Sequence, residues 1–440
     1  MNFERMRALF LDQAIRGELV PQLAEEGVAE QFGVSPEKKP FVIPNSWKWI
    51  QLKHLVSVVS GTSYKKSDQV SEGGVRIIRG GNLRNFKIEL RSDDVFVACS
   101  LEDPVREIQK EDIVIVASTG SKEVIGRAAV YAGEERVQIG AFLRIVRPKF
   151  VSYSDYLKVI FQSDYYRNHI RSSAKGTNIN NVKKEYITEL YVPIPPIEEQ
   201  TRIVTKLEET FAEIDRAEKA YEELQTLAGV LRGQILQEAI QGKLVPQLTE
   251  EGVVEQIGAA PKSVPFEIPE SWKWVPLSSL GKTHTGTTPS TSTKEYFGND
   301  IPFVKPGDID CCLITYREDG LSSVAREVAR LVPEDSLLMV CIGGSIGKVA
   351  VCDREVSFNQ QINAIVCDEK FSLSAYLFVV MRSPYFQDVV RRNATGTATP
   401  IINKSRWGKI LIPLPPVEEQ DRIVSKVEEL LKQVDVLSTR

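Results

Sequence analysis

The sequence predicts an α+β protein in which two similar globular blocks are joined by long helical segments. The chain repeats its own framework, and long proline-free stretches within that framework carry helical apolar spacing. Between the frameworks lie short β-rich runs followed by amphipathic helical stretches. With 440 residues, 42% of them hydrophobic, the chain has enough apolar material for more than one core.

The framework repeat is the strongest of these signals. The string AIRGELVPQL from Ala14 returns as AIQGKLVPQL from Ala239, and 26 of 42 positions in 14–55 match those 225 residues later. A second pair, YVPIPPIEEQ from Tyr191 and LIPLPPVEEQ from Leu411, aligns at an offset of 220. The two blocks between these anchors are only faintly similar. Such a pattern is typical of a symmetric scaffold that carries two differently tuned modules.

The framework segment Ile197–Ile240 is predicted to form one long helix. It contains no proline, and from Ile214 onward its apolar residues alternate steps of three and four, as in a coiled coil. At 1.5 Å per residue it would span roughly 60 Å. Gly229 and Gly233 weaken helices and mark positions for a bend or break. Val417–Leu437 keeps the same apolar seam.

The two ends of the chain supply the missing part of this repeat. By the two offsets, residue 440 corresponds to position 220 and residue 2 to position 227. The sequence therefore predicts a circular organisation, pseudo-twofold symmetry, two long antiparallel coiled-coil spacers, and residues 1 and 440 close together. The expected segments are an N-terminal helical segment 1–39, a globular domain 40–195, a central helical spacer 196–264, a second globular domain 265–415 and a C-terminal helix 416–440.

Composition excludes several classes of protein. The sequence has no run of eighteen apolar residues and no uninterrupted apolar stretch near its start, so we expect a cytoplasmic location. Six cysteines lack CxxC spacing and three histidines are isolated, which argues against a disulfide framework or a zinc site. Net charge is −4, yet residues 40–196 carry +6 and residues 265–416 are neutral. The excess acid therefore lies in the connecting segments.

Polar loops interrupt the apolar runs at matching places in both blocks. They are rich in side chains that bind phosphates or read base edges, Arg and Lys for guanine, Asn and Gln for adenine. Solvated turns explain any single loop as well, but recurrence in both blocks favours nucleic-acid binding. The candidate DNA contacts are Lys65, Lys66, Arg79, Asn82, Arg84, Lys122, Asn178 and Asn180 in the first block, and Thr287, Thr288, Lys305, Lys348, Gln360, Gln361, Thr397 and Asn403 in the second.

The other motifs in the sequence do not indicate a catalytic function. The string GGSIGK at Gly343–Lys348 is one residue too short for a phosphate-binding loop, and Val349 stands where a Ser or Thr is needed. The paired WKW strings lie in the near-identical framework beside proline, which favours packing anchors over base-stacking platforms. Metalloprotease, hydrolase and dinucleotide-binding motifs are missing from the sequence. We therefore expect no catalysis by this chain alone.

The strings LVPQL…EEG, IPxSWKW and PxPPxEEQxRIV, each present twice, resemble the DNA-specificity subunit of type I restriction–modification systems. The resemblance covers essentially the whole chain. It implies that the two blocks are target-recognition domains for a bipartite, asymmetric DNA target. It also implies that two methyltransferase subunits dock on the spacers and that restriction subunits join them. S-adenosylmethionine, ATP and Mg would then be bound by those partners, with no cofactor in this chain.

Docking of the partners would use the framework. The candidate docking residues are Glu198, Glu199, Arg202, Lys206, Glu418, Glu419, Arg422 and Lys426, although a solvated helix face explains them equally well. Two other functions remain open at this point. A two-headed coiled-coil adaptor would bind proteins and give no sequence-selective footprint on DNA. A nuclease or methyltransferase with an unrecognised site would be active as the purified chain.

Overall fold

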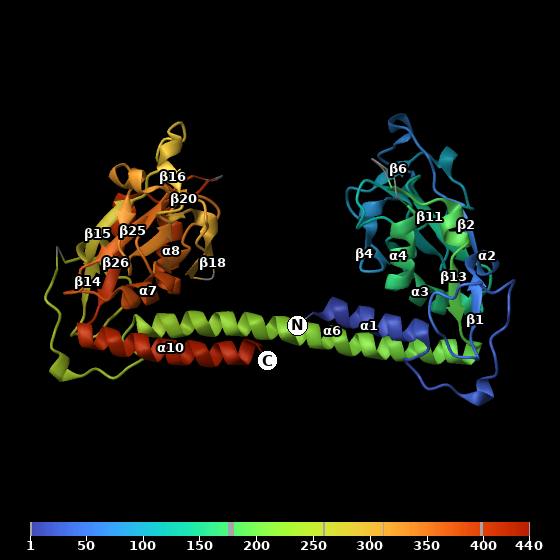
Figure 1. Ribbon diagram of the computed structural model, residues 1–440, viewed down its shortest axis with the longest axis horizontal. Coiled ribbons are helices and arrows are strands. Elements are labelled where there is room, and N and C mark those ends of the chain that lie inside the picture. Colours follow the sequence, from blue (N-terminus) through green and yellow to red (C-terminus); the bar gives the residue numbers. More distant parts are fainter. Residues whose placement is uncertain (1, 175–179, 258–259, 311, 397–398, 440) are drawn as a thin grey trace. The chain divides into compact units, whose positions relative to one another are not determined.

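The computed structural model describes residues 2–174, 180–257, 260–310, 312–396 and 399–439 (Figure 1). The chain divides into two compact units, Met1–Ala220 and Tyr221–Arg440. Each unit combines sheets with packed helices, which confirms the α+β prediction. Among the described residues, no helix is both long and apolar enough to cross a membrane.

The first unit is built around a six-stranded sheet with the order β2-β11-β7-β9-β5-β4. A three-stranded sheet, β10-β3-β6, packs beside it, and β1 pairs with β13. The bounds are α1 (Phe3–Arg16), β1 (Lys48–Gln51), α2 (Leu52–Leu55), β2 (Val56–Ser60), β3 (Val75–Ile78), β4 (Leu83–Arg84), β5 (Lys87–Ile88), β6 (Val95–Val97), β7 (Ile113–Val116), β8 (Ser118–Thr119), β9 (Ala128–Val130), β10 (Val137–Ile139), β11 (Leu143–Pro148), α3 (Ser154–Gln162), α4 (Asp164–Ser173), β12 (Asn180–Asn181), α5 (Lys184–Thr188), β13 (Tyr191–Ile194) and α6 (Ile197–Ala239).

The second unit repeats this arrangement with a four-stranded sheet, β15-β25-β22-β23, and a three-stranded sheet, β17-β24-β21. The bounds are β14 (Lys273–Pro276), β15 (Gly281–Thr285), β16 (Phe297–Gly298), β17 (Phe303–Val304), β18 (Ile309–Asp310), β19 (Leu313–Ile314), β20 (Gly320–Leu321), β21 (Leu331–Val332), β22 (Leu337–Val340), β23 (Val349–Val351), β24 (Val356–Phe358), β25 (Ile362–Cys367), α7 (Ser374–Arg382), α8 (Pro384–Asn393), α9 (Lys404–Gly408), β26 (Leu411–Leu414) and α10 (Val417–Thr439).

A central strand in each unit is buried on both faces. In β7, Ile113 and Ile115 face the core that includes α3 and α4, whereas Val114 and Val116 face the core that includes β10. Strand side chains alternate between faces, so a fully apolar strand must be covered on both sides. This three-layer arrangement explains the continuous apolar character of two runs in the sequence, DIVIVAS (Asp112–Ser118) and SLLMVCIGG (Ser336–Gly344).

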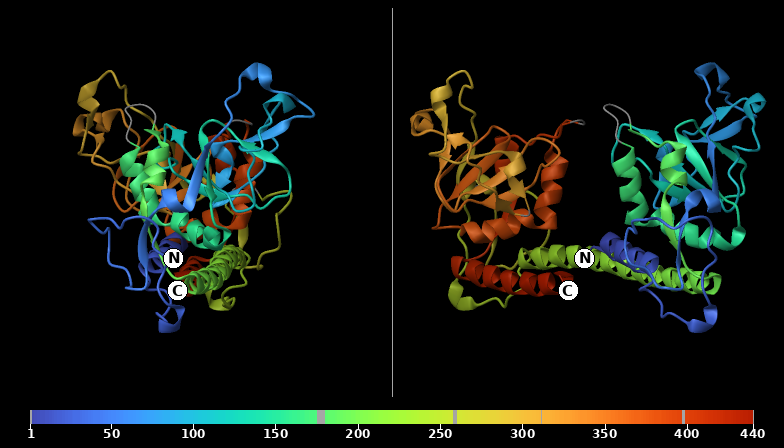
Figure 2. Two further views of the ribbon diagram at one scale, coloured as in Figure 1. Left: turned by 90° about the vertical axis from the view of Figure 1, so that its right-hand side faces the viewer. Right: turned by 45° about the vertical axis from the view of Figure 1, so that its right-hand side comes forward.

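The predicted long helix is confirmed, because α6 runs for 43 residues and passes through both glycines without a break. Within the first unit, α1 packs antiparallel to α6: Arg7 pairs with Asp215 and Glu218 at 2.6 Å each. Within the second unit, α10 packs against the later part of α6, and Arg232 pairs with Asp435 at 2.7 Å (Figure 1, Figure 2). Each terminal helix therefore supplies the partner helix of its own unit, as the circular organisation requires.

Two of the predicted helical segments are shorter than expected. Segment 1–39 is α-helical only over Phe3–Arg16, because Gly17 adopts a left-handed conformation (φ 75°) that ends the helix. Segment 196–264 is α-helical only as far as Ala239, and Gly242 is again left-handed (φ 68°). The predicted proximity of residues 1 and 440 concerns residues outside the described part of the chain.

A buried carboxylate explains why the framework is repeated so closely. Glu199, in the first turn of α6, is 1% exposed and accepts hydrogen bonds from the Trp47 indole (2.9 Å) and the Gln22 amide (2.5 Å). Glu419 accepts the same bonds from Trp272 (2.9 Å) and Gln247 (2.5 Å). These contacts join three framework segments that are far apart in the sequence.

The tryptophans are therefore buried anchors, as predicted; Trp47, Trp49, Trp272 and Trp274 are all at most 5% exposed. Burial raises the pKa of Glu199, although the hydrogen bonds from Trp47 and Gln22 lower it in part. Desolvation disfavours the charged form, whereas donors to the carboxylate favour it. Glu419 shows the same balance.

We expect Trp47→Phe to destabilise the protein by about 1–3 kcal/mol more than Trp49→Phe, because it leaves a buried carboxylate oxygen without its donor. The indole nitrogen of Trp49 has no hydrogen-bond partner in the described structure, so the control loses similar area but no such bond. Chemical unfolding measures the loss of stability in both variants. Equal losses would contradict a role for the hydrogen bond.

The same substitution should change the pH dependence of stability. Loss of the Trp47 donor raises the pKa of Glu199 further, so the folded state holds this proton more tightly than the unfolded chain does. The free energy of unfolding then falls as pH rises through the window above the usual glutamate pKa, more steeply than in the wild type.

Candidate nucleic-acid interface

The predicted loops of the first unit meet at one edge of its sheets. The Thr62 amide donates to the Ile139 carbonyl (2.8 Å), and the Gly140 amide donates to the Ile78 carbonyl (2.9 Å). Strand β12 pairs antiparallel with β8. Loops that are up to about 120 residues apart in sequence thus form one surface.

The equivalent loops of the second unit meet in the same way. The Thr287 amide donates to Phe358 (3.0 Å), and the Cys341 amide donates to Gln361 (2.8 Å). The Ile402 amide donates to the Cys341 carbonyl at 3.0 Å, which attaches the loop before α9. We call these two sets the first and second loop surfaces: residues 60–69, 78–85, 117–127, 140–142 and 180–183, and residues 285–288, 304–310, 341–348, 359–361 and 399–403.

Most predicted contact residues are accessible on these surfaces. Lys65, Lys66, Arg79, Arg84, Lys122, Thr288, Lys348, Gln360 and Asn403 are exposed, and Thr287, Lys305 and Gln361 are half-buried. Asn180 lies in β12, and only its backbone is described. Asn178 and Thr397 lie outside the described residues.

Asn82 corrects one of these predictions, because its side chain is 2% exposed and fully engaged. Its oxygen accepts from the Arg79 amide (2.9 Å), and its nitrogen donates to the Glu89 carbonyl (2.9 Å) and Asp94 Oδ1 (2.7 Å). Asn82 is therefore unavailable for adenine. It holds the turn that presents Arg79 and Arg84.

The second loop surface places carboxylates beside its cations. Lys348 Nζ lies 2.9 Å from Asp310 Oδ1, and Lys305 Nζ lies 3.6 Å from an oxygen of Asp319. The Thr288 hydroxyl donates to the Gln360 amide oxygen at 2.6 Å. The second surface is therefore mainly neutral and polar, whereas the first exposes Lys and Arg.

Phe142 was missed by the sequence analysis. Its side chain is 68% exposed on the first loop surface, while its carbonyl accepts from the amides of Ala117 (2.8 Å) and Ser118 (3.1 Å). The backbone is thus fixed and an aromatic ring points to solvent. In the second unit, Gln361 accepts the equivalent bond from Cys341. Hydropathy assigns a phenylalanine to a core, so no sequence signal distinguishes this position.

Known proteins similar to this chain identify its family. A family model described as type I restriction modification DNA specificity domain matches residues 44–226 and 269–440. The chain belongs to this family. Each unit carries most of one matched segment, and we call the globular parts of these segments, before α6 and before α10, the first and second target-recognition domains.

The sequence of this chain is similar to those of related proteins over most of their length. The chain is 27% identical over 409 residues to the type I restriction enzyme EcoKI specificity subunit of Escherichia coli strain K12, covering 90% of this chain and 84% of that protein. It is 27% identical over 411 residues to the StySPI specificity subunit of Salmonella potsdam, with 90% and 84% coverage.

Solved structures show the same fold. A chain from a structure of a type I R-M system superposes with a TM-score of 0.69 at 19% identity, covering 91% of this chain and 94% of that one. The HsdS subunit from Thermoanaerobacter tengcongensis gives a TM-score of 0.53 at 19% identity, with coverage of 90% and 92%.

The predicted docking residues divide into two groups. Glu199 and Glu419 are buried within the framework, and Arg202 and Arg422 form bidentate pairs with Glu26 and Glu251 at 2.5–2.8 Å. Those four side chains hold the fold together, which corrects the prediction for the two glutamates. Glu198, Lys206 and Glu418 are exposed, and Lys426 is half-buried beside Glu429.

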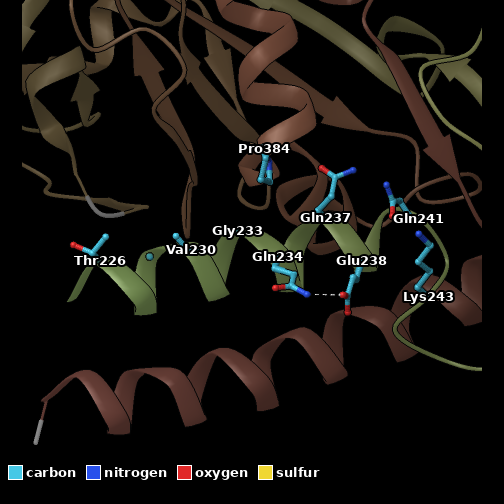
Figure 3. A pocket seen from close by; sticks show the side chains of 10 residues that line it. Thr226, Val230, Gly233, Gln234, Gln237, Glu238, Gln241, Lys243 and Pro384 are labelled. Atoms are coloured by element: carbon cyan, nitrogen blue, oxygen red, sulfur yellow. Dashed lines mark hydrogen bonds between the residues drawn. The ribbon is translucent and has the colours of Figure 1, made fainter. Parts of the chain in front are cut away.

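A shallow hollow of about 740 Å³ lies along α6 of the second unit (Figure 3). Thr226, Val230, Gly233 and Gln237 line it together with Pro384 of α8. Its lining is mostly amide and aliphatic. In the described part of the chain, no group of three or more His, Cys, Asp or Glu side chains is placed to hold a metal ion.

Arg144 links two loops of the first surface. Its guanidinium donates to the Ser60 hydroxyl (2.6 Å) and to the Val182 carbonyl (3.3 Å), and burial lowers its pKa.

We expect Arg144→Met to speed hydrogen exchange at residues 60–62 and 180–183, while β7 stays protected. Arg147→Met, which removes an ion pair to Asp112 at the other end of β11, is the matched control and should leave these loops unchanged. Unaltered exchange in Arg144→Met would contradict the link.

Proposed function

We propose that this chain is the non-catalytic recognition subunit of a type I restriction–modification system and reads a bipartite, asymmetric DNA target. The observation that carries this proposal is one fold present twice with unlike side chains on equivalent loop surfaces. Cationic Arg79 and Arg84 characterise the first surface, and neutral Thr288 and Gln360 the second. Two unlike readers in one chain specify two unlike half-sites.

Each surface has donors suited to base edges and to phosphates. Arg side chains on the first surface fit guanine O6 and N7, and amides on the second fit adenine N6 and N7. Joining both readers in one chain makes the second contact intramolecular, so two weak interactions combine into strong binding. The near-neutral total charge suggests that partner subunits add the remaining positive surface.

We assign the methylation and restriction reactions to partner subunits. Two methyltransferase subunits would bring S-adenosylmethionine, and restriction subunits would bring ATP and Mg. The relatives' names as specificity subunits of restriction enzymes support this division. The remaining docking candidates are the exposed framework residues Glu198, Lys206 and Glu418 and the half-buried Arg202, Arg422 and Lys426.

Methylation mapping tests the function. With its methyltransferase subunits in a host that lacks other adenine methylation, the chain should direct methylation to one split sequence. Replacing Arg79 and Arg84 by Ala should relax only one half-site, at about 1–3 kcal/mol per lost base contact. The matched pair Thr288→Ala and Gln360→Ala should relax only the other. Methylation without a split motif, or none at all, would refute the proposal and favour an adaptor.

Phe142→Ala should weaken binding to the target duplex, because an exposed ring on this surface is suited to apolar contact with a thymine methyl group. We expect a loss of about 1–3 kcal/mol on the target and almost none on an unrelated duplex. Thermal stability should hold, since the ring is already solvated. Phe150→Ala is the control. Phe150 lies away from the loop surface and stacks on Phe32 with the ring centroids 5.8 Å apart, so this substitution should lower stability and leave DNA binding unchanged. Equal weakening on both duplexes would contradict base contact.

A further inference from the structure

A cationic cleft of about 710 Å³ lies beside the first loop surface. Its cations are Lys122 and Arg127 from the loop after β8, and Arg167 and Arg171 from α4. Arg167 and Arg171 are four residues apart and therefore lie on the same face of the helix. Two exposed carboxylates, Glu4 and Glu123, complete the lining, so cations outnumber anions four to two.

The arginines of the cleft are held by neutral groups. Arg167 donates to the backbone carbonyls of Ile125 (3.0 Å) and Glu123 (2.6 Å), and Arg127 donates to the carbonyl of Leu83 (3.2 Å). In the described part of the chain, no ion pair joins any of the four cations to a carboxylate. The guanidiniums are thus positioned without being neutralised.

The electrostatics agree with this geometry. Burial lowers the pKa of Arg167, and the neighbouring charges of Arg171 and Arg127 lower it further. Like charges held together disfavour one another unless an anion joins them. A bound phosphate would relieve this repulsion and accept several charge-assisted hydrogen bonds.

The second domain has the same fold but does not place the same charges at the equivalent described positions. At the offset of 220, Gln387 replaces Arg167, and it donates to the carbonyls of Gly347 (2.8 Å) and Met381 (2.7 Å). Lys348, which follows the left-handed Gly347 as Arg127 follows Gly126, is paired with Asp310. The excess charge is therefore particular to the first domain.

We propose that this cleft binds a phosphodiester of the DNA backbone and anchors the first domain independently of sequence. The inference rests on the proposed function. Lys122 belongs to the first loop surface, and Arg127 contacts the backbone at the base of the hairpin that carries Arg84, so the cleft continues that surface. None of the described residues that line it is aromatic, so the cleft offers no ring to stack on the base of a free nucleotide.

The test uses the full chain assembled with its methyltransferase subunits, and Arg171→Gln as the variant. Arg171 is exposed, and among the described residues it makes a single long hydrogen bond, to the Glu123 carbonyl at 3.5 Å, so the fold should survive. Affinity is measured against salt on a target duplex and on an unrelated duplex. We expect equal weakening on both, and a plot of log affinity against log salt less steep by about 1.

Two controls accompany this variant. Arg391→Gln changes the equivalent exposed arginine of the second domain and should leave the salt slope unchanged. Arg171→Lys keeps the charge and should keep most of the slope. An unchanged slope in Arg171→Gln, weakening on the target duplex alone, or equal effects of both Gln variants would overturn the cleft proposal. If the wild-type assembly showed no preference for any target, the proposed function would fail instead, and the slope on the unrelated duplex would still decide the cleft.

Discussion

The structure depends on a buried carboxylate that occurs once in each unit. Glu199 and Glu419 lie in the first turns of α6 and α10, where the positive end of the helix dipole favours an anion. Each accepts from a tryptophan and a glutamine of distant framework segments. Because a buried charge needs all of its donors, these segments must keep the same residues in both copies. The divergent blocks are free of this requirement.

This separation allows specificity to change without a change of fold. Strands such as β7 and β22 are buried on both faces and hold the layers together. The loops at their ends contact one another through backbone hydrogen bonds, which do not depend on side-chain identity. The exposed candidate contact residues therefore occupy positions where substitution costs little stability. That is the arrangement expected of a module that diverges in target while its scaffold stays constant.

The two loop surfaces differ in their electrostatics. The first surface exposes Lys and Arg and adjoins a cleft in which Arg167 donates to backbone carbonyls. The second pairs Lys305 and Lys348 with carboxylates, so its polar groups are mainly neutral. Backbone charge contributes affinity without sequence information, whereas amides and hydroxyls contribute selectivity. Under the proposed function, the first domain would combine anchoring with reading, and the second would mainly read.

Periodicity and repetition in the sequence determined the α+β class, the duplication, the long helix and the burial of the tryptophans, because these depend on local spacing and on apolar content. Only the tertiary structure decided which polar residues are available. Asn82, Glu199 and Glu419 are residue types that suit a binding site, but their side chains are buried. Glu199 and Glu419 accept hydrogen bonds from residues far away in sequence, whereas Asn82 is engaged by the turn in which it lies and by Asp94. Phe142 is hydrophobic, as core residues are, but its side chain is exposed. The arginine cleft joins side chains from a loop and a helix about 40 residues apart, and no linear pattern brings such residues together.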